Sequence, residues 1–373
     1  MTVDFIIIGG GIFGVYTALY LTQQGQSGIL LEKEPRLLSR ASLVNQARLH
    51  GGYHYPRSVA TAQLSHEHQS RFIRDHRDFI HASFDQFYAI DRFGSLTDGL
   101  QFRRFCDYIG APLEEVVVEN PFHAQRIANL YKTTEYSFDP VLLGNHYSEK
   151  ISQNADIQLF TNTEIKQVEK NGENWEIDFL DKNKKVVQCK TPLVVNATYA
   201  ASNAIHKLFD VPTIDLQYEI AEMVLLSVPQ FANQGLTIMD GQFGSLMPYG
   251  LTGLHSLSSV AYTHHEVSKQ ELPTFNCQKA HQSCSPNLLA HCNHCHLRPS
   301  SNFNKMRSQL QQYFTEAVQF DFYQSLFTIK SKLRANSIDD GRPTEIRKLA
   351  SAPDFYCVFA GKVQSIYEIE KVF

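Results

Sequence analysis

Near its start the chain reads Asp4-Phe-Ile-Ile-Ile-Gly-Gly-Gly-Ile-Phe-Gly14, and this stretch decides the fold. The unbroken apolar run Phe5–Ile8 is typical of a strand buried on both faces of a parallel sheet. Glycines in the pattern G-x-G-x-x-G follow, and Val15–Thr22 then predicts a helix. A second apolar run, Gly28–Leu31, predicts the next strand and leads directly into Glu32. This order of strand, glycine turn, helix, strand and acid predicts a dinucleotide-binding unit.

Each glycine of the turn has a separate task in such a unit. Gly9 permits the tight turn, Gly11 lets a pyrophosphate approach the backbone, and Gly14 lets the helix pack closely on the strand. The first helical residues, Ile12 and Phe13, place unpaired backbone N–H groups where they can bind the phosphates.

The end of the second strand is predicted to bind the ribose. The carboxylate of Glu32 can accept hydrogen bonds from a ribose diol, and Lys33 follows it in the same turn. An acid at this position disfavours a 2′-phosphate, which argues against NADP. Residues 100–330 contain no second strand–GxGxxG–helix unit, so we expect electrons to come from the substrate rather than from a nicotinamide.

Composition excludes several classes of protein. The 373 residues include 34 Lys and Arg against 38 Asp and Glu, so the chain lacks the basic excess of a nucleic-acid binder. Its 25 Phe and 17 Tyr exclude a disordered chain. No apolar run reaches the roughly 18 residues of a membrane-spanning helix, and the first residues do not resemble a secretory signal. Seven cysteines, an odd number, favour free thiols, and we expect a cytoplasmic protein.

After the second strand the chain resembles a known family. Asn45-Gln46 is followed by Arg48-Leu-His50-Gly51-Gly-Tyr-His54-Tyr-Pro-Arg57. This stretch resembles the flavin-side segment of the D-amino acid oxidase/glycine oxidase superfamily. It is also similar to the corresponding stretch of FAD-dependent glycerol-3-phosphate dehydrogenases and L-2-hydroxyglutarate oxidases. The resemblance implies FAD as the cofactor, with Asn45, Gln46, His50 and Gly51 close to the flavin.

Later segments resemble the same superfamily in the same order. Leu193–Thr198 resembles the strand and turn that close the FAD domain, which puts Ala197 and Thr198 beside the cofactor. Asp340–Thr344 and Phe359–Val363 resemble the two last elements, which flank the flavin ring and supply Gly361, Lys362 and Val363. The resemblance also implies that the backbone of Val168 contacts the adenine. By pattern alone, Val168 fits a plain β-meander equally well.

The resemblance implies an α/β fold with two interleaved domains. A Rossmann-like FAD-binding domain of the glutathione-reductase type would comprise residues 1–85, 150–205 and 330–373. A substrate domain of the α+β type, built on a mixed or antiparallel sheet, would comprise residues 86–149 and 206–329.

In the middle of the chain, helices are predicted at 58–70, 72–93 and 101–109, and strands at 221–228, 244–248 and 257–263. The aromatic residues Tyr249, His255 and Tyr262 are candidates to line a substrate cavity, although each also fits ordinary aromatic packing. We include Tyr262 among the candidate catalytic residues.

The predicted function is oxidation of the C–N bond of an amino acid or secondary amine, with hydride transfer to flavin N5. One alternative is C–OH oxidation of a 2-hydroxy acid or polyol phosphate, with His50 or His54 as the base. A second alternative is a flavin-binding protein without turnover. The resemblance also allows a covalent bond from His50 to the flavin, but we expect simple contact.

Arg342 is predicted to bind an anionic group of a small-molecule substrate. Gly341-Arg342-Pro343 resembles the place where amino acid oxidases of the superfamily carry a carboxylate-binding arginine, and a planar guanidinium can bind two oxygens at once. The alternative is a salt bridge from Arg342 to Asp339 or Asp340.

One segment is unusual in composition. Cys277–His296 contains four cysteines and four histidines, and Cys292-x-x-Cys295 has the spacing of half a zinc site. Cys277 or Cys284 with a histidine would complete a tetrahedral set. The full spacing matches no closed zinc signature, so the sequence predicts no metal, while zinc or a disulfide stays open.

Overall fold

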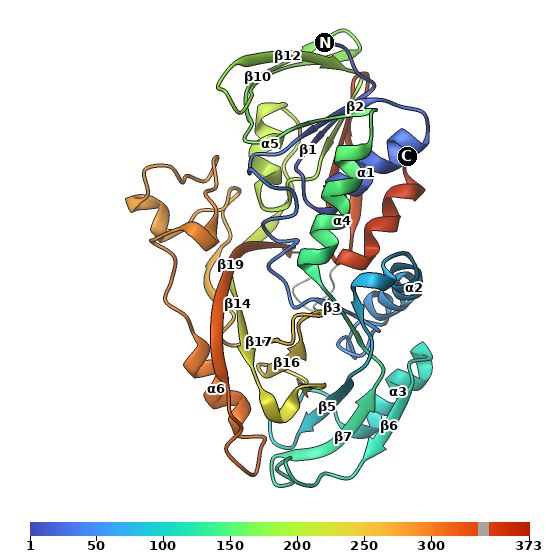
Figure 1. Cartoon of the computed structure of the whole chain (residues 1–373), viewed down its shortest axis with the longest axis vertical. Helices are drawn as coiled ribbons and strands as arrows, with labels where there is room; N and C mark the ends of the chain where they lie inside the picture. Colours follow the sequence, from blue (N-terminus) through green and yellow to red (C-terminus); the bar gives the residue numbers. More distant parts are fainter. Residues whose placement is uncertain (335–342) are drawn as a thin grey trace.

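The computed structural model describes residues 1–334 and 343–373. A six-stranded sheet in the order β20-β21-β13-β1-β2-β9 forms the upper part of the molecule in Figure 1. All neighbouring pairs from β21 to β9 are parallel, and the edge strand β20 is antiparallel to β21. The strands are β1 Phe5–Ile8, β2 Gly28–Leu31, β9 Ile157–Phe160, β13 Leu193–Asn196, β20 Glu345–Ala350 and β21 Asp354–Phe359.

Strand β1 alternates its side chains between two separate hydrophobic clusters, as a strand covered on both faces must. Phe5 and Ile7 pack with the helices α1 Ile12–Gln23 and α4 Pro140–Gln153, which lie side by side on one face. Ile6 and Ile8 pack on the other face against a three-stranded antiparallel sheet. That sheet consists of β10 Glu164–Asn171, β11 Asn174–Leu180 and β12 Val186–Thr191.

The lower part of the molecule contains a nine-stranded sheet. Its order is β18-β14-β17-β16-β15-β5-β7-β6, with β19 paired along β14, and only the β5–β15 pair is parallel. The strands are β5 Asp85–Asp91, β6 Leu113–Val116, β7 Ile127–Thr133, β14 Leu216–Ser227, β15 Gln234–Met239, β16 Gly244–Pro248, β17 His255–Ser259, β18 His264–Ser268 and β19 Asp321–Leu333.

Short elements connect these layers. A small sheet pairs β8 Tyr136–Phe138 with both β3 Arg48–Leu49 and β4 Ile80–His81. The remaining helices are α2 Val59–Asp75, α3 Gly99–Ile109, α5 Ser202–Leu208 and α6 Phe303–Gln311. The 3-10 turns are η1 Arg77–Phe79, η2 Tyr199–Ala201, η3 Pro229–Phe231, η4 Asn276–Ala280, η5 Cys292–His294 and η7 Val363–Lys371.

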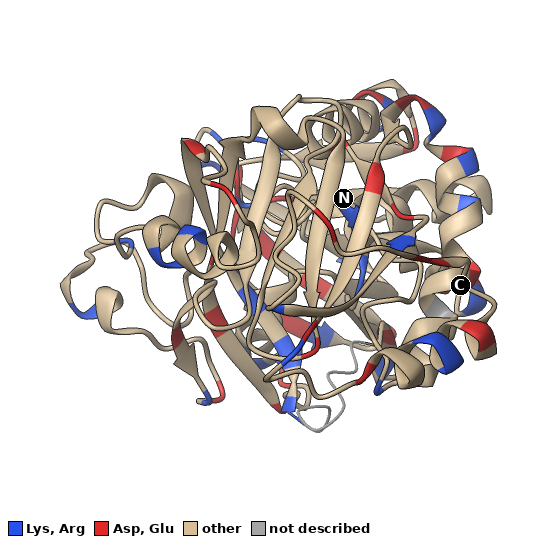
Figure 2. Cartoon of the chain, turned by 90° about the horizontal axis from the view of Figure 1, so that it is seen from below, with Lys and Arg blue, Asp and Glu red and all other residues tan. Residues whose placement is uncertain are grey.

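The predicted α/β fold with a Rossmann-like sheet and a second, mixed sheet is confirmed. The exact domain boundaries stay a prediction. Figure 2 shows Lys and Arg interspersed with Asp and Glu over the elements visible from below. Among the helices of the described residues, none is both long and apolar enough to span a bilayer.

The longest of the predicted helices is wrong. The helix expected over residues 72–93 ends at Asp75, and β5 occupies Asp85–Asp91. The reason is tertiary pairing, because β5 hydrogen-bonds to β7 on one side and β15 on the other, and such pairing overrides local propensity. Helix α3 is confirmed and begins with a capping box between Asp98 and Gln101.

A buried histidine gives the fold a predicted acid sensitivity. His76 Nδ1 lies 2.9 Å from the Phe72 carbonyl oxygen, and Nε2 lies 2.7 Å from the Tyr147 hydroxyl. Burial lowers the pKa of His76 to about 4, against 6.5 for an ordinary histidine. The folded state therefore favours neutral His76, and this stability is complete above pH 6.5 and falls as the pH drops from 6.5 toward 4.

We expect His76 to account for a loss of about 2 kcal/mol in the free energy of unfolding between pH 7 and pH 5. Urea titrations at the two pH values measure it. The His76→Asn variant should show a smaller difference between the two pH values than the wild type. The same substitution at the exposed His66 is the matched control and should leave the difference unchanged. Equal pH dependence in His76→Asn and wild type would contradict the assignment.

Candidate functional site

The glycine turn between β1 and α1 has the geometry of a phosphate-binding loop. Gly9 has a φ of +105°, which favours glycine, and a Cβ there would lie 2.8 Å from the Ala197 oxygen. A Cβ on Gly14 would lie 1.9 Å from the Gly9 oxygen, so only glycine allows this strand and helix to pack. A Cβ on Gly11 would contact only Ser42 Oγ, at 3.4 Å. Space is therefore left at Gly11, where a phosphate would approach.

Helix α1 begins directly after this turn, with Ile12 as its first residue. Ile12 and Phe13 are buried, and the Ile12 amide donates to Ser42 Oγ at 3.0 Å. No side-chain cap comes from Gly11, the residue before the helix. The start of the helix thus faces the space at Gly11 with its dipole unopposed by a capping acid, which suits an anion.

Glu32 lies at the carboxyl end of β2, beside the glycine turn. Its Oε2 accepts from the Gly10 amide at 2.6 Å, and its Oε1 accepts from the Glu34 amide at 2.7 Å. These bonds fix the carboxylate at the edge of the turn, where a ribose would follow the phosphates. Burial raises the pKa of Glu32, and the two backbone hydrogen bonds oppose that shift.

The Lys33 side chain points to a different part of the chain. Its Nζ donates to the Leu289 carbonyl oxygen, and burial lowers the pKa of Lys33 to about 8. Lys33 therefore contacts the Cys277–His296 segment through its side chain. Only its backbone remains available for the cofactor role predicted from the sequence.

Asn45 and Gln46 are held in a tight turn that precedes β3. Asn45 Oδ1 accepts from the Ala47 amide at 2.7 Å, and its Nδ2 donates to the Ser42 oxygen at 2.8 Å. Gln46 Nε2 donates to Ser258 Oγ on β17. The turn thus contacts β17 of the nine-stranded sheet, at the place where the resemblance expects the flavin.

Four side chains form a compact group that we call the His–Tyr–Lys cluster: His50, His54, Tyr55 and Lys362. The ring centroids of His50 and His54 are 5.9 Å apart, and each lies 5.5 Å from the Tyr55 ring. Lys362 Nζ lies 3.8 Å from the centroid of the same tyrosine ring. The structure therefore brings together candidates that are some 300 residues apart in the sequence.

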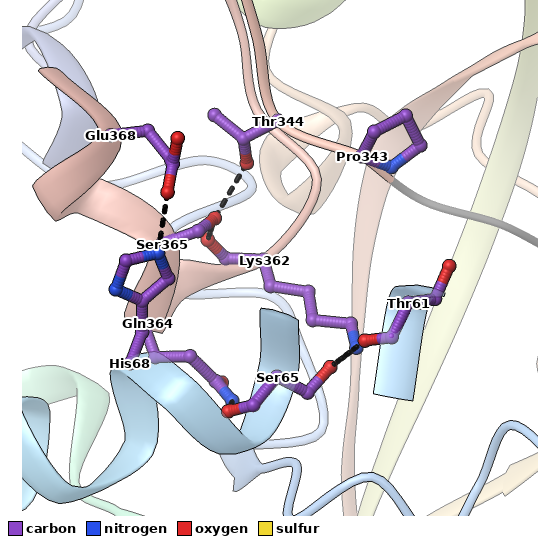
Figure 3. Close-up of a pocket in the computed structure, with 9 residues that line it drawn as sticks. All are labelled: Thr61, Ser65, His68, Pro343, Thr344, Lys362, Gln364, Ser365 and Glu368. Atoms are coloured by element: carbon purple, nitrogen blue, oxygen red, sulfur yellow. Dashed lines mark hydrogen bonds and ion pairs between the residues drawn. The ribbon is translucent and has the colours of Figure 1, made fainter. Parts of the chain in front are cut away.

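Lys362 also borders a small polar cavity of about 50 Å³, shown in Figure 3. Lys362 donates to Ser65 Oγ, and Gln364 Nε2 donates to the His50 carbonyl oxygen at 2.8 Å. The Gly361 amide donates to Thr344 Oγ1 at 2.9 Å. These bonds tie the turn after β21 to α2 and to the His50 segment. The cavity is lined by Thr61, Ser65, His68, Pro343, Thr344, Lys362, Gln364, Ser365 and Glu368.

The other predicted cofactor contacts fall in four places. Ala197 and Thr198 follow β13 beside the glycine turn, and the Ala197 amide donates to the Ile8 oxygen at 2.8 Å. Val363 starts η7 and packs on the core cluster that contains Ile7. Val168 is half-buried in β10, paired with Ile177. The Gly51 backbone is buried within the His50–Tyr55 segment.

Tyr262 does not join these residues. The strand expected over 257–263 ends at Ser259, and Tyr262 lies in the following turn, packed on the cluster that contains Leu246 and Met306. Its expected neighbours are also ordinary core residues. The His255 ring is buried with Nε2 3.1 Å from the Gln234 oxygen, and the Tyr249 hydroxyl donates to the Leu43 oxygen at 2.9 Å. Arg342 lies outside the described residues.

Sequence reasoning missed two parts of this region. Ser42 accepts a hydrogen bond from the first residue of α1, and it was not among the predicted cofactor contacts. The second part is a buried ion pair beneath the His50 segment, with Arg48 Nε 3.4 Å from Glu135 Oε2 and both side chains almost fully buried. Arg48 also donates to Ser245 Oγ at 2.7 Å and Thr237 Oγ1 at 2.8 Å. The sequence did contain a signal for this ion pair, because Arg48 is a charged residue in the flavin-side segment, two positions before His50-Gly51-Gly52.

Fold and site together define a dinucleotide-binding flavoprotein. FAD fits because Gly9 and Gly14 admit no side chain, Gly11 leaves room for a phosphate, and the Glu32 carboxylate is fixed beside that room. The chain belongs to the family of FAD-dependent oxidoreductases, whose pattern matches residues 4–249. It is therefore an oxidoreductase with FAD as its cofactor, as predicted from the sequence.

Two curated proteins resemble the chain at 27% identity each. The chain is 27% identical over 272 residues to the FAD-dependent monooxygenase FPY4 of Fusarium mangiferae, covering 69% of this chain and 64% of that protein. It is 27% identical over 255 residues to the FAD-dependent monooxygenase kojA of Aspergillus flavus, covering 65% and 57%. The match thus spans less than two thirds of these relatives' length.

Solved structures share the fold over the whole chain. Glycine oxidase from Geobacillus kaustophilus superimposes with a TM-score of 0.69 at 12% identity, covering 99% of this chain and 91% of that one. The L-α-glycerophosphate oxidase of Mycoplasma pneumoniae with FAD bound gives 0.73 at 14% identity, covering 100% and 93%. At these identities the likeness shows the fold alone.

Proposed function

We propose that the protein oxidises the C–N bond of an amino acid or secondary amine that carries an anionic group. The observation that carries this proposal is the His–Tyr–Lys cluster, because it places a cation beside an aromatic ring and two imidazoles next to the turn Gly361–Val363. A carboxylate can pair with the Lys362 ammonium, which lies over the Tyr55 ring and borders the small cavity. Glycine oxidase, one of the solved structures with this fold, bears a name that agrees with this class of substrate.

FAD, when bound, supplies the hydride acceptor of this reaction. The chain orients the substrate so that the hydrogen on its α-carbon faces that acceptor. A neutral amine needs no protein base, because the nitrogen lone pair forms the C=N bond as the hydride leaves. Water then hydrolyses the imine to a carbonyl compound and an amine. If the substrate is instead an alcohol, His50 or His54 can take the hydroxyl proton.

The test is anaerobic bleaching of the purified yellow protein. We expect the flavin absorbance to disappear with at least one member of a panel of D- and L-amino acids and N-methyl amino acids. Bleaching only by 2-hydroxy acids or glycerol phosphate would show that the protein oxidises C–OH bonds, and would contradict the proposal of C–N oxidation. Bleaching only by NADH or NADPH would favour the monooxygenase activity that the names of the curated relatives state, and would contradict this proposal.

A further inference from the structure

The small polar cavity beside Lys362 lies between α2 and η7 and has a volume of about 50 Å³ (Figure 3). Its lining includes one ammonium, one carboxylate and one imidazole, those of Lys362, Glu368 and His68. The proposed function uses only the first of these groups. A buried water needs about 10–15 Å³ of such space, so the cavity has room for water.

Gln364, which lines the cavity, has a buried acceptor without a donor. Its Nε2 donates to the His50 oxygen at 2.8 Å and to the Ser65 oxygen at 3.1 Å. These two bonds fix which end of the amide is nitrogen and which is oxygen. Its Oε1 is buried and accepts no hydrogen bond from any residue that the structure describes. Water usually satisfies such buried groups, and a water in the cavity supplies the missing donor.

One end of the cavity is an ion pair near the surface. His68 Nε2 lies 2.6 Å from Glu368 Oε1, and Lys371 Nζ donates to the same oxygen at 2.7 Å. The His68 ring also packs 6.0 Å from the ring of Tyr367, the residue before Glu368. The side chains of His68 and Glu368 are 7% and 21% exposed, and that of Lys371 is 54% exposed. The pair thus connects the cavity with bulk water.

The other end of the cavity reaches the His–Tyr–Lys cluster. Lys362 Nζ lies 3.8 Å from the centroid of the Tyr55 ring and donates to Ser65 Oγ, and Ser65 lines the cavity. The ammonium of Lys362 therefore borders both the cluster and the cavity. This ammonium repels a proton, whereas the carboxylate of Glu368 attracts one. The charges along the cavity thus favour movement of a proton from the cluster toward the surface.

We propose that water in this cavity and the His68–Glu368 pair carry a proton from the candidate active site to solvent. The inference rests on the proposed function, because an amine is mainly an ammonium ion near neutral pH and must lose a proton before its lone pair can form the C=N bond. The N–H bond breaks, its electron pair stays on nitrogen, and the proton binds the cavity water. The water passes a proton to the His68–Glu368 pair, which releases it to solvent. Both residues act through the water and do not touch the substrate.

The experiment follows anaerobic bleaching of the FAD-loaded protein by stopped flow, with the amine of the panel that bleaches it fastest. His68→Asn should slow bleaching at pH 7 by roughly a hundredfold, as expected for loss of a proton-transfer group. The deficit should disappear at about pH 10, where much of the amine arrives neutral. Imidazole in the buffer should restore the rate at pH 7, because a diffusing base can replace the missing one. His66→Asn changes an exposed histidine of the same helix and should bleach like the wild type.

Glu368→Gln provides a second test that holds even if His68→Asn fails to fold. Glutamine keeps the length of the side chain and a hydrogen bond to His68 but removes the charge that attracts the proton. We expect slower bleaching at pH 7 and recovery at about pH 10, with FAD content equal to that of the wild type. A crystal structure of the FAD-loaded wild type should show water within hydrogen-bond distance of Gln364 Oε1.

Several results would overturn the inference. One is wild-type bleaching rates at pH 7 in both variants. Another is equal slowing at both pH values without rescue by imidazole, which would make the pair structural. A dry cavity in the crystal would remove the water. Bleaching only by 2-hydroxy acids would refute the proposed function alone, because an O–H proton must also leave, and rescue by imidazole would then decide for or against the relay. Absence of bleaching by either class would refute both.

Discussion

The Gly11→Val variant should purify as a folded protein that contains no FAD. In the structure a Cβ on Gly11 touches only Ser42 Oγ, at 3.4 Å, so the protein alone has room for a larger side chain. The pyrophosphate of the cofactor needs the same room, because it must approach the backbone of this turn. Flavin absorbance per chain, together with the melting temperature of protein stripped of cofactor, measures the two effects separately.

Gly14→Ala is the matched comparison for this prediction. Its Cβ would lie 1.9 Å from the Gly9 oxygen, so the strand and helix must move apart whether or not FAD is bound. We expect Gly14→Ala to lower the stability of the stripped protein, whereas Gly11→Val leaves that stability nearly unchanged. A Gly11→Val protein that purifies fully yellow would refute the placement of the pyrophosphate.

The Lys362→Met variant should raise KM for the substrate by roughly a hundredfold. Loss of a charged pair shielded from water costs about 3 kcal/mol, and each 1.4 kcal/mol is about a factor of ten. Methionine keeps the length of the side chain over the Tyr55 ring, where Lys362 Nζ now lies 3.8 Å from the centroid. Steady-state kinetics with the amine that bleaches the flavin give the KM.

Two further variants control this measurement. Lys362→Arg keeps the positive charge and should recover most of the affinity, while Lys348→Met removes an exposed lysine on β20 and should change nothing. If Lys362→Met instead loses FAD with KM unchanged, the lysine binds the cofactor, as the resemblance implies. If it melts at a lower temperature with KM unchanged, the lysine is structural. Arg342→Met belongs in the same series, because the sequence predicts Arg342 as the anchor, and a hundredfold rise there alone would transfer the role to it.

The sequence was most informative where local chemistry alone determines the structure. The residue types alone indicate the roles of Phe5–Ile8, the glycines and Glu32. The structure has β1, α1 and β2 where these residues predict them. The strand β5 could not be predicted in this way. Asp85–Asp91 becomes a strand because β7 and β15 flank it, and both come from distant parts of the chain.

The candidate site shows the same division. Lys362 was predicted as a cofactor contact because the segment Phe359–Val363 resembles an element that flanks the flavin. Its position over Tyr55, however, depends on how α2 and η7 pack together. Tyr262 was a candidate to line the substrate cavity, and a strand was predicted over residues 257–263. The strand ends at Ser259, and the following turn packs Tyr262 on the hydrophobic cluster that contains Leu246 and Met306. Alternation gives a side chain's face but not where its strand stops.

The order of strands in the six-stranded sheet has a consequence for biosynthesis. β1 at Phe5–Ile8 pairs with β13, and β13 pairs with β21 at Asp354–Phe359. At about 5–20 residues per second, a ribosome needs roughly 20 to 70 s between the first and the last of these strands. During that time the apolar β1 lacks part of its sheet. Nascent chains should therefore depend on chaperones until synthesis is nearly complete, and capture FAD only afterwards.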